Sequence, residues 1–172
     1  MLRFIPILER TNIEVGDLPP AVELNGCLLY FGPFPEGDGR LLVHPRIEIE
    51  DNPDCIALVA HELAHMLLHR LYDHPPSVVD LLFDPSQRAL YDYYEREADR
   101  LAAYLLVRPD IWDGFPVDLF PTPERLAEVL GVPARCVRLA FEEPWQDPEP
   151  VHTFLLELIG QPDFLAREAI AA

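Results

Sequence analysis

The chain has 172 residues, of which 49% are hydrophobic, so it is long enough and apolar enough to form one packed domain. Thirty acidic side chains against thirteen basic ones give a net charge of -17. A surface this negative repels phosphate backbones and anionic lipid heads, so we expect no direct nucleic-acid partner and no membrane partner.

The cysteines and the apolar segments predict a cytoplasmic protein. Cys27, Cys55 and Cys136 are odd in number, far apart in sequence and form no CxxC pair, which is typical of reduced thiols. The apolar run in residues 1–8 is too short for a secretion signal. No stretch reaches the roughly 18 apolar residues that a membrane helix needs.

Two apolar, β-branched runs near the start predict a short sheet. Residues 21–31 and 40–49 are joined by the turn-forming sequence GPFPEGDG, a pattern typical of a β-hairpin or meander. Pro45 places the middle of the second run at a sheet edge or at the end of a strand.

Two longer helices follow. Asn52, Pro53 and Asp54 form a helix start, and apolar residues at helical spacing extend the predicted helix to about Leu71. Ser86 is the expected cap of a second helix over about 87–107, with a loop over 72–85 between the two.

Shorter helices are predicted in the last third of the chain. Thr122 begins one and Gly131 ends it, and Pro133 begins the next, to about Glu143. Two more follow Asp147 and Gln161, and the acidic run 142–149 is interpreted as a solvated linker. A short sheet followed by helices indicates an α+β fold that is mostly α.

One motif in the first long helix carries chemistry. Residues 61–65 read HELAH, and histidines four apart lie on one helical face, about 6 Å apart along the axis. Both rings of His61 and His65 can then reach one Zn²⁺ ion. Glu62 can lie beside that metal without joining it, where it would act as the catalytic base that moves protons.

Two other histidine patterns are less suitable. A pair formed by His65 and His69 would place Met66 where the base belongs, and His61 and His69 lie about 12 Å apart along the helix axis. Position 71, where the HExxHxxGxxH class has its third ligand, is Leu71, which excludes that class.

A catalytic zinc site needs a third protein ligand, which the second long helix can supply. Glu95 follows the second histidine by 30 residues, and Asp99 lies one turn beyond it on the same face. This spacing suits Glu95 as a ligand and Asp99 as a carboxylate that holds a zinc-bound imidazole. Helical geometry alone leaves Glu97 open as the ligand.

These motifs together resemble the ImmA/IrrE family of zinc metallopeptidases, over roughly residues 20–143. Leu101 stands where the family usually has Phe. The other positions of the family signature after HExxH match here at Glu95, Ala98, Asp99, Ala102, Ala103, Leu105, Leu106 and Pro109. The resemblance implies that His61, His65 and Glu95 are the metal ligands and that Glu62 is the base.

The resemblance also implies a fold and a substrate. We expect a zincin-like (gluzincin-like) core over 1–120, with a small antiparallel sheet packed on the HELAH helix. A helix-turn-helix-like pair over 121–145 and a helical tail over 146–172 would complete one compact unit. The implied activity is a zinc-dependent endopeptidase that cleaves a helix-turn-helix repressor and so derepresses phage, mobile-element or stress genes.

Alternatives remain open from the sequence. The protein could instead bind a regulator without cleaving it, in the manner of a toxin–antitoxin pair, or bind DNA through 122–143, although that segment is not basic. Mn²⁺ or Fe²⁺ could occupy the same ligands as Zn²⁺. The group that polarises the scissile carbonyl could be one of three tyrosines or two histidines: Tyr91, Tyr93, Tyr94, His44 and His74. A role in packing is the simpler interpretation of these residues.

Overall fold

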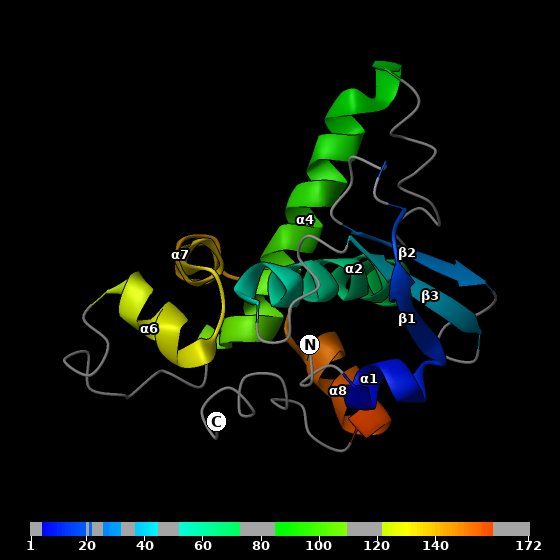
Figure 1. Ribbon diagram of the computed structural model, residues 1–172. Coiled ribbons are helices and arrows are strands. Elements are labelled where there is room, and N and C mark those ends of the chain that lie inside the picture. The colour runs from blue at the N-terminus through cyan, green and yellow to red at the C-terminus, as the bar shows by residue number, and fades with distance from the viewer. Residues whose placement is uncertain are drawn as a thin grey trace.

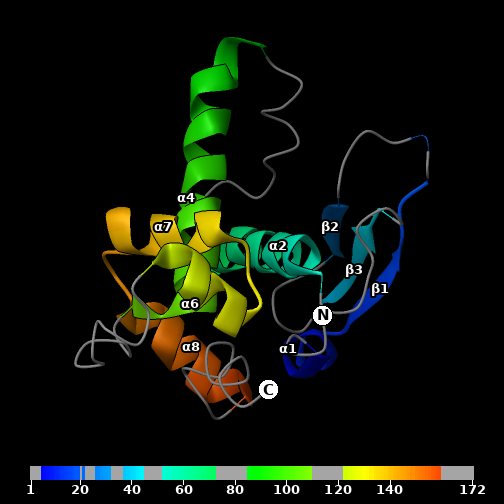
Figure 2. The ribbon, with the colours of Figure 1, turned by 60° about the vertical axis from the view of Figure 1, so that its left-hand side comes forward.

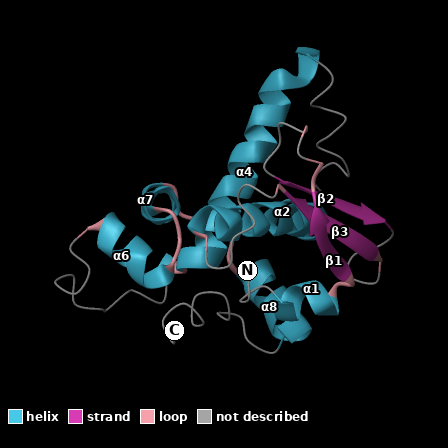
Figure 3. Ribbon diagram, in the orientation of Figure 1, coloured by secondary structure: helices cyan, strands magenta, loops and turns pink. Residues whose placement is uncertain are grey.

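The computed structural model describes residues 5–19, 21, 26–31, 37–44, 52–72, 85–109 and 122–159. Within these ranges the chain is mostly helical with a small sheet at the N-terminal side, as the α+β prediction requires (Figure 3). Residues 73–84 of the predicted 72–85 loop, including His74, lie outside the described residues, as do Pro45, the helix after Gln161 and the side chain of His69.

The sheet is mixed, which corrects the predicted antiparallel sheet. The described strands are β1 (Ile13–Asp17), β2 (Gly26–Phe31) and β3 (Asp38–Val43), in the order β1-β3-β2. The predicted hairpin is confirmed, since β2 pairs with β3 antiparallel. On the other side of β3, β1 runs parallel to it.

The strand β1 and the preceding helix α1 (Ile5–Arg10) were not predicted. Ile13 is the one buried residue of β1 and Val15 is exposed, so this strand of five residues does not present the buried apolar face that marks a half-buried strand. β3 lies between β1 and β2 in the sheet, so β1 pairs with a strand that is not its neighbour in sequence. Such a pairing depends on contacts far apart in sequence, which local patterns do not report.

Helix α2 (Pro53–Tyr72) forms as predicted. The side-chain oxygen of Asn52 accepts a hydrogen bond of 3.0 Å from the backbone N–H of Asp54, as a helix cap should. Val59, Ala60 and Ala64 are fully buried. Figures 1 and 2 show α2 at the centre, with the sheet at one end and α4 crossing it.

Helix α4 (Arg88–Val107) also forms as predicted, although the expected Ser86 cap is wrong. A 3-10 turn, η2 (Pro85–Gln87), precedes it, and Gln87 occupies the cap position without a side-chain hydrogen bond. The C-terminal part of α4 from residue 101 onward is buried, whereas its N-terminal half projects beyond the rest of the described chain (Figure 1). The site described below lies between these two halves.

Three shorter helices follow: α6 (Pro123–Leu130), α7 (Ala134–Glu142) and α8 (Glu149–Ile159). Thr122 caps α6 by accepting a hydrogen bond from the N–H of Arg125, and Gly131 ends it with a positive φ of 62°. The predicted boundaries of α6 are therefore confirmed, and α7 lies between Pro133 and Glu143 as predicted. α7 packs against α4, whereas α8 contacts α1 and α2.

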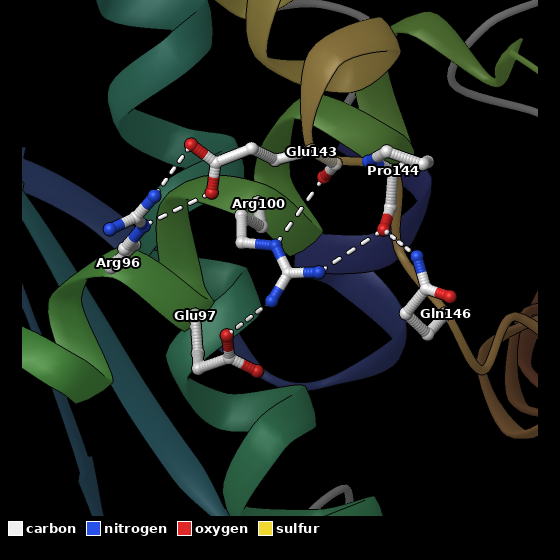
Figure 4. Close-up of polar contacts among 6 residues, drawn as sticks. All are labelled: Arg96, Glu97, Arg100, Glu143, Pro144 and Gln146. Atoms are coloured by element: carbon white, nitrogen blue, oxygen red, sulfur yellow. Dashed lines mark hydrogen bonds and ion pairs between the residues drawn. The ribbon is translucent and has the colours of Figure 1, made fainter.

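The acidic segment after α7 connects α7 to α8 and contains no buried residue, as expected of a solvated linker, but it also contacts α4. Figure 4 shows that Glu143 accepts two hydrogen bonds from Arg96 of α4, at 3.0 and 2.6 Å. Arg100 of α4 donates to the backbone oxygens of Glu143 and Pro144 and pairs with Glu97 at 2.6 Å. The segment is thereby fastened to the helix that carries Glu95.

Cys27, Cys55 and Cys136 are all free thiols. Among the described helices, none has both the length and the apolar character that crossing a membrane requires.

Candidate metal centre

Helices α2 and α4 bring three predicted ligands together. The Nε2 atoms of His61 and His65, one turn apart on α2, are 3.0 Å from each other. The two carboxylate oxygens of Glu95 on α4 face them, Oε2 at 3.4 Å from His61 and Oε1 at 3.4 Å from His65. Two nitrogens and a carboxylate therefore converge on one point.

This spacing fits a tetrahedral zinc ion. With ligands about 2.0–2.1 Å from the metal, neighbouring ligand atoms in a tetrahedron are roughly 3.3–3.4 Å apart. The observed separations of 3.0, 3.4 and 3.4 Å are close to that value. The donor set is also chemically suitable, since two imidazoles and one carboxylate leave a fourth position open for water or substrate.

Asp99 fixes the orientation of one imidazole. Its Oδ1 atom lies 2.8 Å from Nδ1 of His61. An ionised carboxylate can only accept a hydrogen bond, so Nδ1 of His61 is the donor. In the neutral ring this leaves the lone pair on Nε2, the atom that faces Glu95 and His65.

Glu62 lies beside the cluster without being one of its ligands. Its Oε2 atom accepts a 3.0 Å hydrogen bond from the backbone N–H of Leu28 in β2. Burial raises the pKa of Glu62, and the nearby charges of His61 and His65 oppose that rise. A carboxyl group with a raised pKa, next to two imidazoles, is well placed to exchange protons.

Glu97, the alternative ligand, is directed elsewhere. Its carboxylate pairs with Arg100 at 2.6 Å, and both side chains are largely buried. Glu97 and Glu95 are two positions apart on α4, which turns their side chains to different sides of the helix. The structure therefore brings Glu95, not Glu97, to the two histidines.

The charges around the triad favour a bound cation. Burial lowers the pKa of His61, but hydrogen bonds to Asp99 and Glu95 outweigh it and raise the pKa to about 10. Burial raises the pKa of Glu95, but hydrogen bonds from His61 and His65 lower it well below its usual range. Both shifts have the same origin: the carboxylates of Glu95 and Asp99 stabilise a positive charge at His61. A proton or a metal ion can supply that charge.

The three candidate tyrosines of α4 have different contacts. Tyr91 forms a side-chain hydrogen bond with Glu95. Tyr93 and Tyr94 contact each other edge to face, with ring centroids 5.4 Å apart. His44 is buried after β3 and is not part of the cluster.

Sequence reasoning did not anticipate two contacts. The bond between Leu28 and Glu62 joins a strand to a helix through a backbone N–H, so no residue type could have indicated it. The spacing of four residues between Tyr91 and Glu95 was a usable signal, because such residues are neighbours on a helix surface.

Comparisons of this chain with protein-family models, with curated proteins and with solved structures found no match.

Proposed function

We propose that this protein is a zinc-dependent endopeptidase. The observation that carries the proposal is the convergence of His61, His65 and Glu95, with Glu62 adjacent to the triad. The same three residues are the ligands implied by the resemblance to the ImmA/IrrE family. A zincin-like core belongs to this proposal, since the α+β architecture alone is shared by many protein classes.

Each residue has a role in the proposed reaction. Zinc, when bound, supplies Lewis-acid activation of a carbonyl and a water that ionises near neutral pH. Glu62 would accept a proton during attack on the peptide bond and return it to the leaving amine. Asp99 would accept the hydrogen bond from Nδ1–H of His61, so that in the neutral ring Nε2 is the nitrogen that binds the metal.

The position of β2 suits an extended peptide as substrate. β2 lies at one edge of the described sheet, next to β3 only. Its Leu28 N–H reaches Glu62, so a peptide lying along β2 would pass the triad. A net charge of -17 favours protein partners with basic surfaces, such as DNA-binding repressors, through electrostatic complementarity.

The first experiment separates catalysis from binding. The wild-type protein and Glu62→Gln would be loaded with zinc and incubated with a candidate repressor, and cleavage would be followed by mass spectrometry. We expect one specific cut with the wild type and none with the variant, at equal zinc content. Full relief of repression by Glu62→Gln in cells would instead support sequestration of the regulator without cleavage.

A second experiment tests the ligand set with a matched pair of variants. Glu95→Gln removes a ligand charge, whereas Glu97→Gln makes the same change two positions along the same helix. We expect one zinc ion per chain in the wild type and in Glu97→Gln, and a large loss in Glu95→Gln, measured by elemental analysis after dialysis. Equal zinc content in both variants would contradict the proposed site.

A further inference from the structure

Tyr91 contacts the candidate metal centre through a ligand. It lies one helical turn before Glu95 on α4, and the two side chains share a hydrogen bond. Since an ionised carboxylate can only accept, the phenol O–H of Tyr91 is the donor. Glu95 thus has a partner on its own helix in addition to the two histidines on α2.

The ring of Tyr91 is itself held in place. The guanidinium carbon of Arg88 lies 5.2 Å from the centre of the ring, within the range of a cation–π contact. Arg88 also pairs with Asp92 at 2.9 Å along the same helix. These contacts restrict the rotation of Tyr91, which lies in the first turn of α4.

Core packing does not account for this tyrosine. Among the described residues, Tyr104 belongs to the hydrophobic core, whereas Tyr91 is neither in the core nor packed against it. The neighbouring Tyr93 and Tyr94 contact each other, and Tyr93 is 52% exposed. A role in positioning Glu95 therefore explains the placement of Tyr91 better than a role in folding.

We propose that Tyr91 is a positioning residue for the metal ligand Glu95. By donating to the carboxylate, it holds both oxygens toward His61 and His65 and reduces the rotational freedom that metal binding would remove. Hydrogen bonds to metal-ligating carboxylates commonly strengthen metal binding 10- to 100-fold. This inference rests on the proposed zinc site.

The test compares Tyr91→Phe with Tyr93→Phe, which removes the same hydroxyl from an exposed ring two positions away. Zinc affinity would be measured by competition with a chromophoric chelator, and the visible spectrum of the Co²⁺-loaded protein would be recorded. We expect Tyr91→Phe to weaken zinc binding about tenfold and to alter the Co²⁺ spectrum. Tyr93→Phe should change neither, and the melting temperatures of both metal-free variants should match the wild type.

The outcomes distinguish this inference from the proposed function. Zinc binding by the wild type with an unchanged affinity and spectrum in Tyr91→Phe would overturn the positioning role and leave the metal site intact. Equal weakening in Tyr91→Phe and Tyr93→Phe would also overturn it, because the effect would then come from general loss of a hydroxyl. A wild-type protein that binds no zinc would overturn both proposals.

Discussion

Asp99 on α4 holds His61 on α2 through a 2.8 Å contact between Oδ1 and Nδ1. The contact links the two helices that supply the candidate ligands, and it sets which nitrogen of the ring is free to bind a cation. Asp99 itself is 60% exposed, so its placement at the imidazole is not a consequence of burial in the core.

Replacing Asp99 by Ala should weaken zinc binding about 10- to 100-fold, because His61 would lose the acceptor that fixes its ring. Zinc affinity would be measured by chelator competition. Asp54→Ala is the matched control, since Asp54 lies on α2, is similarly exposed and is ion-paired with Arg135. A loss of affinity of equal size in both variants would contradict the specific role of Asp99.

Gly26 allows β2 to approach α2 closely. A Cβ atom at this position would lie 2.4 Å from Leu58 Cδ2 and 2.9 Å from the backbone oxygen of Leu42. We expect Gly26→Ala to lower the free energy of unfolding by about 1–3 kcal/mol, as overpacking does. Denaturant unfolding would measure the change.

Gly16→Ala is the control for this prediction, since its Cβ would have only an ordinary contact of 3.4 Å with the side chain of Leu42. We expect it to change stability much less. Equal destabilisation by the two substitutions would show that the close approach of β2 to α2 is not the reason why a side chain at position 26 is unfavourable.

Arg100 should contribute more to stability than Arg96, although both fasten α4 to the segment after α7 (Figure 4). Arg100 is largely buried and neutralises Glu97, whose side chain is only 15% exposed. Arg100→Met should cost about 1–3 kcal/mol in thermal or denaturant unfolding, because Glu97 would lose a charged partner. Arg96→Met should change the stability little, because the side chain of Arg96 is exposed. A larger loss of stability in Arg96→Met than in Arg100→Met would contradict this prediction.

The buried thiol of Cys136 should react slowly at pH 8. Burial raises its pKa from 9.0 to about 11, so the thiol stays protonated at pH 8. The folded state therefore binds this proton more tightly than the unfolded state, and the corresponding stability is present below pH 9 and lost as pH rises toward 11.

Ellman's reagent would test this in variants that retain one cysteine each. We expect the variant with Cys136 to react more slowly at pH 8 than the variant with Cys27, which is only partly buried. Its rate should continue to rise between pH 9 and 10.5. A rate for Cys136 that reaches a plateau below pH 9 would contradict the raised pKa.

Local chemistry in the sequence determined the helices and part of the site. Caps at Asn52 and Thr122 and the stop at Gly131 lie within a few residues of the backbone groups they satisfy, so the boundaries of α2 and α6 could be predicted. His61 and His65 lie on one face of α2 for the same reason, because their spacing is fixed by the geometry of one helix.

The tertiary structure decided the relationships between elements. The rotation of α4 against α2 selected Glu95 over Glu97 as the partner of the histidines, and the position of β2 brought the N–H of Leu28 to Glu62. The parallel pairing of β1 with β3 was likewise set by contacts distant in sequence. A residue pattern reports the near neighbours of each side chain, whereas these pairings depend on how whole helices and strands pack in three dimensions.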